Sequence, residues 1–448
     1  MRLCIYSIGL VLLTFVPGPG SALAHPGPAG PPAAADEVLA WNATALAAAE
    51  VGGQNNIVIT RTLAMVHLAV HDALNSISRR YEPYALQARA EPGTEPAAAL
   101  ATAARSVLVR LIPRYGSAAQ QAKATEIVEG AYADALARLP DAPAKDHGIG
   151  AGRAAAEAML TLRETDGAFA AARYTPGTGP GQWRPTPNPF PPHPSVPDPA
   201  MAAGNLPALQ PQWGEVTPFT LLTPAQLRLP PPPPLTSQGW ARDYDEVKRV
   251  GGKDSAARTP EQAETVRYWY EGSPQGWNRI ARVVAGSRSL DAWERARLFA
   301  LVNAAMADGF IAAADTRYRY DFWRPVTAIR AGDTDGNDAT TPDPAWESYV
   351  NTPPMPDYPS THSVLGAAAA AVMTRFFGTD GVAFTMTSGA PFAGITRSFT
   401  SFSQAARENA ESRILGGIHF RSACENGLAL GESIGRRAMA HRLRRYQP

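Results

Sequence analysis

The sequence has few cysteines and no excess of charge of either sign. Cys4 and Cys424 are the only cysteines among 448 residues, and 41 basic residues are matched by 40 acidic ones. A disulfide framework is excluded, because two thiols can form one bridge at most. The balanced charge gives no support for nucleic-acid binding, which requires a basic surface.

Long hydrophobic runs are also scarce. The amino-terminal run, residues 5–16, is shorter than the roughly 18 residues that span a membrane. It follows a positively charged start and precedes Ala22-Leu-Ala24, a small-x-small cleavage signal, so residues 1–24 have the order of a secretory signal peptide. An uncleaved anchor is the alternative. We expect cleavage after Ala24 and export to the periplasm or the extracellular space, which leaves Cys424 as the one thiol of the mature chain.

One later stretch, residues 364–372, is apolar. It is again too short to span a membrane and is better explained as part of a core helix. We therefore expect no membrane span in the mature chain.

Helical patterns dominate what the sequence does contain. Hydrophobic residues make up 45% of the chain, as in an ordinary globular protein, and many segments are alanine-rich, periodic and bounded by proline or glycine. We predict an all-α fold with a minor β-hairpin at residues 383–387 and 395–399. The expected helices are 36–50, 60–77, 95–112, 117–139 and 144–165 in a first set, and 259–270, 290–317, 360–377, 403–415 and 420–444 in a second set.

Proline is dense between these two sets, over residues 174–236 and above all in 189–199 and 230–234. Because proline cannot donate a backbone hydrogen bond, this segment is expected to be an extended connection that wraps the protein. A PxxP ligand of a signalling domain is the alternative. The connection separates an expected helical scaffold, residues 25–173, from a C-terminal helical bundle, residues 237–448.

An arginine and a histidine flank a glycine pair in Arg413-Ile-Leu-Gly-Gly-Ile-His419. On an unbroken helix, six residues at about 100° each would turn the two side chains to different faces. Gly416 and Gly417 favour a helix end, which lets the chain re-aim both side chains into one pocket. A helix C-cap with incidental neighbours is the alternative.

Two further segments contain side chains that can bind an anion or transfer a proton. Ser360 and His362 begin an alanine-rich run, where a helix N-terminus would offer unpaired N–H groups to an anion. Arg317 and Arg324 lie seven residues apart, which is two helical turns and nearly one helix face. Pro325 is expected to end that helix just beyond Arg324.

Together these residues have the chemistry that a tetrahedral oxyanion requires. Guanidinium groups bind pairs of anionic oxygens and stay charged at any physiological pH. One histidine can bond the central atom while the other moves protons. The set consists of Arg317, Arg324, Ser360, His362, Arg413 and His419.

The ordered motifs resemble those of the type 2 phosphatidic acid phosphatase and vanadium-dependent haloperoxidase superfamily. The shared pattern is a basic residue, six residues and Arg-Pro, then Pro-Ser-x-His, then Arg, five residues and His. The amino-acid sequences of residues 320–330, 356–360 and 411–420 are similar to those of the soluble bacterial haloperoxidase branch. The similarity extends to residues 396–403 and 64–73. The resemblance covers most of the mature chain. It implies two packed helical bundles, the first serving as scaffold.

The resemblance also implies roles for single positions. His419 matches the histidine that bonds vanadium in the haloperoxidases and forms a phosphohistidine in the phosphatases. His362 matches the acid–base histidine. Arg324 and Arg413 match arginines that neutralise equatorial oxyanion oxygens, and Ser360 matches a hydroxyl that hydrogen-bonds one of them.

Two positions depart from the pattern of this family. Arg317 stands where the family usually carries a lysine that contacts and polarises bound peroxide. We therefore expect Arg317 to be both a catalytic and an oxyanion-binding residue. Arginine keeps the charge but spreads it over a planar fork. Thr361 stands where the haloperoxidases commonly carry glycine, and it retains the backbone N–H that would face the anion. We expect oxyanion binding to survive both changes unless φ must be positive at Thr361.

The leading hypothesis is a secreted vanadium-dependent haloperoxidase-like enzyme with vanadate bonded through His419 and with peroxide and halide as small-molecule substrates. The alternative is an acid phosphatase at the same site, in which His419 attacks the phosphorus of a phosphomonoester and phosphate is the near-isosteric occupant. A non-catalytic oxyanion-binding or interaction protein is a third interpretation. Self-association as a homo-oligomer stays open.

Two other groups of residues superficially suggest metal sites. His67 and His71 lie four residues apart on one predicted helix face, but no third ligand is placed by the sequence, so core or interface packing is preferred. The acidic segment 333–338 resembles a calcium loop, but Pro344 occupies the position of the expected glutamate. We predict a turn there.

Overall fold

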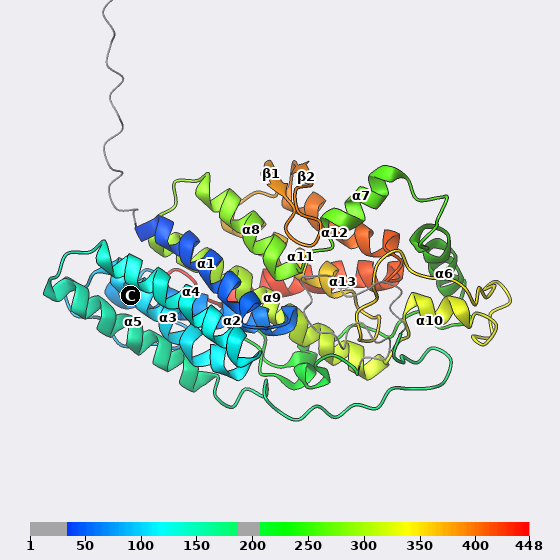
Figure 1. The fold of residues 1–448 in the computed structure, drawn as a ribbon, viewed down its shortest axis with the longest axis horizontal. Coiled ribbons are helices and arrows are strands. Elements are labelled where there is room, and N and C mark those ends of the chain that lie inside the picture. Colours follow the sequence, from blue (N-terminus) through cyan, green and yellow to red (C-terminus); the bar gives the residue numbers. More distant parts are fainter. Residues whose placement is uncertain (1–33, 187–206, 448) are drawn as a thin grey trace, which may run out of the picture. The chain divides into compact units, whose positions relative to one another are not determined.

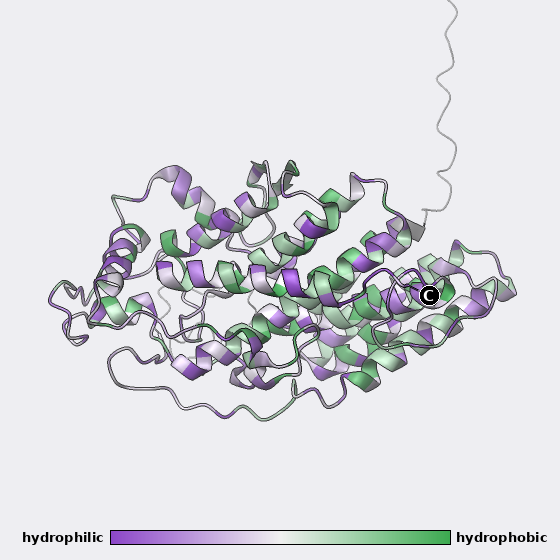
Figure 2. Ribbon diagram, turned by 180° about the vertical axis from the view of Figure 1, so that it is seen from behind, coloured by the Kyte–Doolittle hydropathy of each residue, from purple (hydrophilic) through white to green (hydrophobic). Residues whose placement is uncertain are grey.

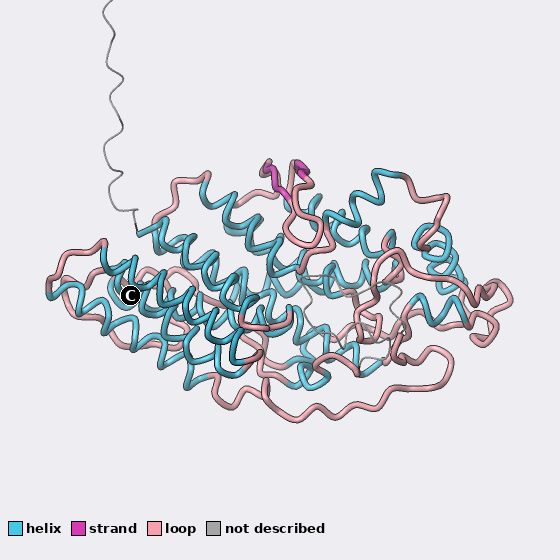
Figure 3. The backbone as a smooth tube through the Cα atoms, viewed as in Figure 1, coloured by secondary structure: helices cyan, strands magenta, loops and turns pink. Residues whose placement is uncertain are grey.

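The computed structural model describes residues 34–186 and 207–447. The expected signal peptide, residues 1–24, lies outside the described residues, as does the stretch 187–206 of the proline-rich connection. The described part of the chain is mostly helical with one small two-stranded sheet, as Figure 3 shows. The all-α prediction is confirmed.

The described elements follow one another as two runs of helices separated by irregular chain (Figure 1). The first run contains α1 (Ala34–Val51), α2 (Asn56–Ile77), α3 (Pro96–Leu111), the 3₁₀ turn η1 (Ile112–Arg114), α4 (Ala118–Ala137) and α5 (Pro143–Leu162). The 3₁₀ turns η3 (Pro211–Glu215) and η4 (Pro224–Leu227) lie in the connection. The second run contains α6 (Gln238–Gly251), α7 (Pro260–Tyr268), α8 (Ser273–Gly286), α9 (Ala292–Tyr320), α10 (Pro325–Arg330), α11 (Thr361–Phe377), β1 (Phe384–Thr387), β2 (Thr396–Phe399), α12 (Phe402–Leu415) and α13 (Arg421–His441).

Each predicted helix and the predicted hairpin is present, with ends shifted by a few residues. β1 and β2 pair antiparallel, with Phe384 opposite Phe399. The sequence patterns did not predict α6, α8 and α10. Pro274 and Pro325 lie in the first turns of α8 and α10, where proline removes no helical hydrogen bond, so a proline there begins a helix.

Helix α9 joins the two runs of helices. It is buried along most of its length and packs against α2 from the first run and α11 from the second. One continuous hydrophobic core contains side chains from all three helices, among them Leu68, Leu301 and Leu365. Hydrophobic residues recur along the helices of both runs in Figure 2. The site-bearing second run is therefore built onto the first.

Two described helices, α2 and α9, are long and apolar enough to cross a membrane by length and composition alone. The expectation of no later span considered only residues 364–372 and overlooked them. In the fold, 100% of the apolar window of α2 and 94% of that of α9 are buried by other parts of the protein. Their apolar character is accounted for by the core.

Glycines let α13 lie directly against α11. A Cβ atom at Gly431 or Gly435 would collide with the carbonyl oxygen of Val364 or Ala368, one helical turn apart. Helices that meet at such small residues approach closely, and α11 and α13 form the most extensive helix pair of the described chain. This contact fixes the start of α11 beside the chain that leads into α13.

The described parts of the proline-rich connection run along the second set of helices (Figure 1). The N–H of Trp183 donates to the carbonyl of Asp321 at 2.7 Å, and the N–H of Leu209 donates to the carbonyl of Pro354 at 2.8 Å. These partners belong to the loops before α10 and α11. The connection therefore braces both loops that carry predicted site residues.

Candidate functional site

The predicted residues come from the ends of five helices. They are Arg317 in the last turn of α9, Arg324 at the N-cap of α10, Ser360, Thr361 and His362 at the start of α11, Arg413 in the last turn of α12 and His419 just before α13. The three arginines and His362 all act electrostatically on His419. The structure thus brings the predicted charged groups to one place.

The glycine pair before His419 ends α12, as predicted. α12 ends at Leu415, Gly416 is the C-cap, and Gly417 has a φ of 75°. A Cβ atom at Gly417 would collide with the carbonyl oxygen of Gly251. Both the left-handed conformation and the lack of space require glycine here, and the resulting turn re-aims the chain before His419.

The prediction that Arg317 and Arg324 share a helix face is wrong. α9 ends before Asp321, which adopts the left-handed conformation with a φ of 52°. Pro325 begins α10 instead of ending α9. The loop between the two helices nevertheless turns Arg324 toward the site, where its Nη1 lies 3.0 Å from Nε2 of His419.

Arg324 is fully buried and is held by main-chain oxygens. Its Nε donates to the carbonyl of Met355 at 2.7 Å, and its Nη1 donates to the carbonyl of Ile418 at 2.7 Å. Its Nη2 has no hydrogen-bond partner among the described residues. The guanidinium is therefore fixed in place with one donor left over.

Arg317 and Arg413 are buried in the same manner. Arg317 Nη2 donates to the carbonyl of Pro359 at 2.6 Å, and its Nη1 lies 2.8 Å from the sulfur of Met355. Arg413 Nη1 donates to the carbonyl of Trp269 at 3.0 Å. The Nε atoms of both arginines lack a partner within the described chain.

Burial works against the charge of these arginines without removing it. Loss of hydration lowers the pKa of Arg317 and of Arg413 to about 10. Burial lowers the pKa of Arg324 as well; the nearby Asp357 carboxylate opposes this change, and the other two arginines add to it. All three groups remain charged at neutral pH. Like charges buried together are stabilised by an anion among them.

The N-terminus of α11 is open toward this group. Ser360 is the N-cap residue and is fully buried, yet its hydroxyl makes no capping bond and has no partner in the described residues. Thr361 is the first helical residue and has no positive φ. The conformational freedom of glycine is therefore not required at this position, and the backbone conformation is one that threonine adopts without strain.

His362 is the partly exposed member of the group. Its Nδ1 lies 3.3 Å from Oδ1 of Asn409 on α12. Burial of the ring, followed by the charge of Arg413, places the pKa of His362 well below its usual range. The imidazole is therefore neutral at neutral pH, with Nδ1–H held by Asn409 and a lone pair on Nε2.

His419 has a carboxylate neighbour that the sequence patterns did not predict as a site residue. Oδ1 of Asp357 lies 2.8 Å from Nδ1 of His419 and 3.7 Å from Nη1 of Arg324. Burial, and then the charges of the arginines, hold the pKa of His419 well below its ordinary value. Burial raises the pKa of Asp357, whereas Arg324 and the N–H of Phe420 lower it.

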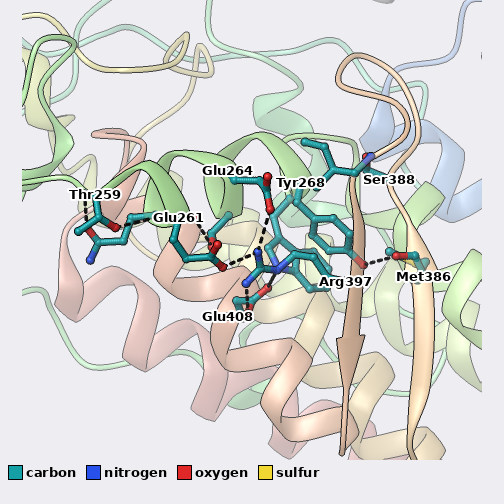
Figure 4. A network of polar contacts seen from close by, with 12 residues as sticks. Thr259, Glu261, Glu264, Tyr268, Met386, Ser388, Arg397 and Glu408 are labelled. Carbon is teal, nitrogen blue, oxygen red and sulfur yellow. Dashed lines mark hydrogen bonds and ion pairs between the residues drawn. The ribbon is translucent and has the colours of Figure 1, made fainter. Parts of the chain in front are cut away.

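A network of ion pairs outside the site links α7, β2 and α12 (Figure 4). Arg397 on β2 contacts Glu261 on α7 at 2.8 Å and Glu408 on α12 at 2.9 Å. Glu408 also accepts a hydrogen bond from the indole of Trp269, whose carbonyl receives Arg413. The network is therefore connected, through Glu408 and Trp269, to the carbonyl that accepts from Arg413.

The two superficial metal candidates have structural partners. His67 is fully buried against Phe299 and its Nε2 lies 2.8 Å from Nδ2 of Asn42, while Nε2 of His71 faces the carbonyl of Glu82 at 3.4 Å. The preferred prediction of core packing is confirmed. Residues 333–338 form a turn, as predicted; within it Asp335 accepts a hydrogen bond from the indole of Trp240 at 2.7 Å. Over residues 34–186 and 207–447, no group of three His, Cys, Asp or Glu side chains is placed to hold a metal ion.

Known proteins match this chain in sequence and in fold. Residues 297–448 match the family described as the second helical-bundle domain of vanadium chloroperoxidase (VCPO). The chain is 29% identical over 377 residues to the vanadium chloroperoxidase of Curvularia inaequalis. That alignment covers 71% of this chain and 60% of the relative, so the chain matches less than two thirds of the relative's length.

Solved structures share the fold. The crystal structure of a bacterial vanadium-dependent iodoperoxidase superposes with a TM-score of 0.75 at 23% identity, covering 92% of this chain and 98% of that one. A bacterial vanadium-dependent chloroperoxidase in its holo form superposes with a TM-score of 0.65 at 20% identity, covering 86% and 91%. Its apo form gives a TM-score of 0.65 at 18% identity, covering 85% and 92%.

Proposed function

We propose that this chain, which belongs to the vanadium haloperoxidase family, is an exported haloperoxidase-like enzyme that binds vanadate and oxidises halide with hydrogen peroxide. The observation that carries the proposal is a set of buried donors without partners in the described chain. They are Nε of Arg317, Nη2 of Arg324, Nε of Arg413 and the hydroxyl of Ser360.

These groups fit a tetrahedral oxyanion. Guanidinium groups donate hydrogen bonds only, and the oxygens of a vanadate or phosphate accept them. A buried donor without a partner costs about 1–3 kcal/mol, and more when it is charged, so an anion that meets several of them together is strongly favoured. Its negative charge would also offset the repulsion among the three buried guanidinium groups.

Each residue has a distinct part in holding the anion. Arg324, Arg413 and Arg317 would neutralise its oxygens, and the Ser360 hydroxyl and the N–H of Thr361 would hydrogen-bond one of them. His419 would bond the central atom through Nε2. Bound vanadate would supply a Lewis-acid centre that activates hydrogen peroxide for reaction with halide.

His362 supplies proton transfer in this proposal. Its ring is neutral, and Nε2 carries the lone pair because Nδ1 faces Asn409. Nε2 can therefore take up a proton from peroxide and return it to a departing oxygen. Its partial exposure gives protons a way to solvent.

The acid phosphatase alternative has one observation in its favour. Asp357 at Nδ1 of His419 makes Nε2 a better nucleophile, which a phosphohistidine intermediate requires. Phosphate has the shape and the acceptors of vanadate, so the same donors would hold it. Activity measurements separate the two reactions.

The test compares the two chemistries on one preparation. Protein loaded with orthovanadate is assayed with hydrogen peroxide and iodide, bromide or chloride, and vanadate-free protein is assayed with a phosphomonoester. We expect halide oxidation that needs vanadate and peroxide together and is absent in His419→Ala. Inert vanadate-loaded protein with efficient phosphomonoester cleavage would replace the proposal by the phosphatase, and two inert assays would leave an oxyanion-binding protein.

Export is a separate part of the proposal. The order of charge, apolar run and cleavage signal in residues 1–24 supports removal of this segment in a bacterial host. The recovered protein is expected to begin at or near His25, as amino-terminal sequencing would report. Full-length protein starting at Met1 in the membrane fraction would contradict export.

A further inference from the structure

Asp357 is a buried acid at the centre of the arginine group. It is fully buried in the loop before α11, where its own N–H donates to the carbonyl of Phe322 at 2.8 Å and the N–H of Phe420 lies close enough to lower its pKa. These contacts tie Asp357 to the chain before α10 and to the chain before α13. The acid is therefore held rigidly at the junction of three site segments.

The contacts of His419 define which of its nitrogens carries hydrogen. Asp357 Oδ1 lies 2.8 Å from Nδ1, and Arg324 Nη1 lies 3.0 Å from Nε2 and farther, at 3.4 Å, from Nδ1. Burial raises the pKa of Asp357 to about 8, and the charges of Arg324 and Arg317 favour its ionised form. In that form the carboxylate can only accept a hydrogen bond, and a guanidinium can only donate one. Neither carboxylate oxygen of Asp357 makes a hydrogen bond of regular geometry within the described chain. Both close contacts nevertheless favour the tautomer in which Nδ1 carries the hydrogen and Nε2 carries the lone pair.

This tautomer presents the lone pair where an anion would be clamped. Arg324 has its free Nη2 beside the Nη1 that faces Nε2 of His419. An oxyanion that takes up this free donor would therefore have its central atom near Nε2, and it would bond the lone pair by displacing the Nη1 contact. The opposite tautomer would direct an N–H against the guanidinium and leave no lone pair for the anion.

We infer that Asp357 is a positioning residue that holds His419 through Nδ1, so that Nε2 is the atom offered to the oxyanion. The inference rests on the proposed function only in taking His419 as the residue that bonds the anion. Carboxylates that hold the far nitrogen of a ligating histidine typically contribute 10- to 100-fold to affinity or activity.

The alternative role for Asp357 is purely electrostatic, and it predicts the opposite sign. A negative charge beside Arg324 repels an anion, so removing it would tighten anion binding if charge were all that mattered. Loss of a positioning contact would weaken binding despite the gain in positive charge. The direction of the change therefore separates the two roles.

The experiment uses the full-length protein with inorganic phosphate and orthovanadate as probes. The variants are Asp357→Ala and Asp357→Asn, whose amide oxygen can still accept from Nδ1–H. The control is Asp335→Asn, another buried acid of the same half, which contacts Trp240 and Thr340 away from the site. Dissociation constants are measured by calorimetry, and the tautomer of His419 by ¹⁵N NMR of histidine-labelled protein, with His419→Gln assigning the signal.

We expect wild-type His419 to carry hydrogen on Nδ1 and Asp357→Ala to lose this preference. Both dissociation constants should rise by about 10- to 100-fold in Asp357→Ala, rise less in Asp357→Asn, and stay unchanged in Asp335→Asn. Hydrogen on Nε2 in the wild type, or unchanged or tighter anion binding in Asp357→Ala, would overturn the inference. If Asp357→Ala does not fold, the wild-type tautomer and the Asp357→Asn constants decide.

Failure of the proposed function would appear differently. A wild type that binds phosphate but not vanadate, or that binds vanadate without oxidising halide, would refute the haloperoxidase proposal. The tautomer of His419 and the phosphate affinities would still decide the role of Asp357.

Discussion

Buried polar groups occur in two regions of this protein, and the regions differ in how many of these groups have hydrogen-bond partners. Where α1, α2, α8 and α9 meet, Asn42 donates to His67 at 2.8 Å and to Asn278 at 2.7 Å, and Asn278 exchanges hydrogen bonds with Asn303. At the site, buried arginines and Ser360 keep donors without partners in the described chain. The first network is complete within the protein, except for Nδ1 of His67, whereas the second requires a ligand.

Asp308 shows the same contrast for a charged group. This fully buried carboxylate on α9 accepts hydrogen bonds from the N–H groups of Phe219, Thr220 and Leu221 and from the Thr220 hydroxyl. It fastens the connection to α9. Nine residues further along the same helix, Arg317 is buried as deeply and keeps a free donor. Satisfied groups of this kind build the fold, and unsatisfied ones mark the place of an anion.

The largest effect is expected from removing the proton carrier. His362→Ala should lower turnover by roughly 10²–10⁴-fold, because an acid–base group is lost, and should keep most of the affinity for vanadate or phosphate. Steady-state assays and anion titrations measure the two quantities. The matched control is His67→Gln, a buried histidine of the asparagine network away from the site, which should leave turnover unchanged. Near-normal turnover in His362→Ala would remove His362 from its role.

The next effect concerns stability in the satisfied region. Asp308→Ala leaves three buried N–H groups without an acceptor, so we expect the free energy of unfolding to fall by about 3–5 kcal/mol. Urea denaturation measures the loss. Anion affinity of the folded variant should not change. A loss below about 1 kcal/mol would show that the connection does not depend on this carboxylate.

Arg413→Met should show the reverse pattern. Among the described residues its main-chain partner is the carbonyl of Trp269. Its charge repels Arg324, so removal should change the free energy of unfolding by no more than about 1 kcal/mol. Anion affinity should fall by at least about 10-fold, because a charged hydrogen bond of about 1.5–3 kcal/mol is lost. A variant that is strongly destabilised and still binds the anion normally would reverse the comparison between the two regions.

A smaller effect is expected from acid. Burial lowers the pKa of His67 to about 3, so the folded protein takes up its proton far below the unfolded value of 6.5. The unfolded state binds more protons between these values, so stability is complete above pH 6.5 and falls as the pH is lowered. His67 alone should cost about 2 kcal/mol at pH 5. Other buried histidines, such as His71, also lower stability in acid, so the loss measured by denaturation between pH 7 and pH 5 should be about 2 kcal/mol smaller in His67→Gln than in the wild type; an equal loss in both would contradict it.

The smallest effect is expected from Arg317→Lys. Total charge is kept, so phosphate affinity should stay within a few fold, while a compact ammonium should reach peroxide better and raise halide oxidation. If phosphoryl transfer is the native reaction, lysine cannot replace the paired hydrogen bonds of the Arg317 guanidinium. The transition state should then lose roughly 1–3 kcal/mol of stabilisation, and phosphatase turnover should fall accordingly. Parallel assays of both reactions distinguish these outcomes.

The sequence predicted the helices whose apolar residues repeat regularly, and it placed Ser360, His362, Arg413 and His419 at helix ends because proline and glycine mark those ends. The sequence wrongly predicted that Arg324 shares a helix face with Arg317, because no local pattern shows that Asp321 adopts the left-handed conformation and ends the helix. It also missed α6, whose exposed face carries many charges.

Asp357 and Asn409 were missed for a different reason. Each acts on a histidine distant in sequence, His419 and His362, and only the packing of α11 against α12 and α13 brings them together. A carboxylate between two prolines was visible in the sequence, but its partner was not. Long-range pairs of this kind depend on the completed fold.

The central claim is that the unsatisfied donors of the site hold one tetrahedral oxyanion. The most direct measurement is a calorimetric titration of the purified protein with orthovanadate, followed by the unfolding temperature at each concentration. The account predicts one anion bound per chain and an unfolding free energy that rises by about 2.7 kcal/mol at one hundred times the dissociation constant, with neither effect in His419→Ala. No binding and no stabilisation of the wild type at millimolar vanadate would contradict it.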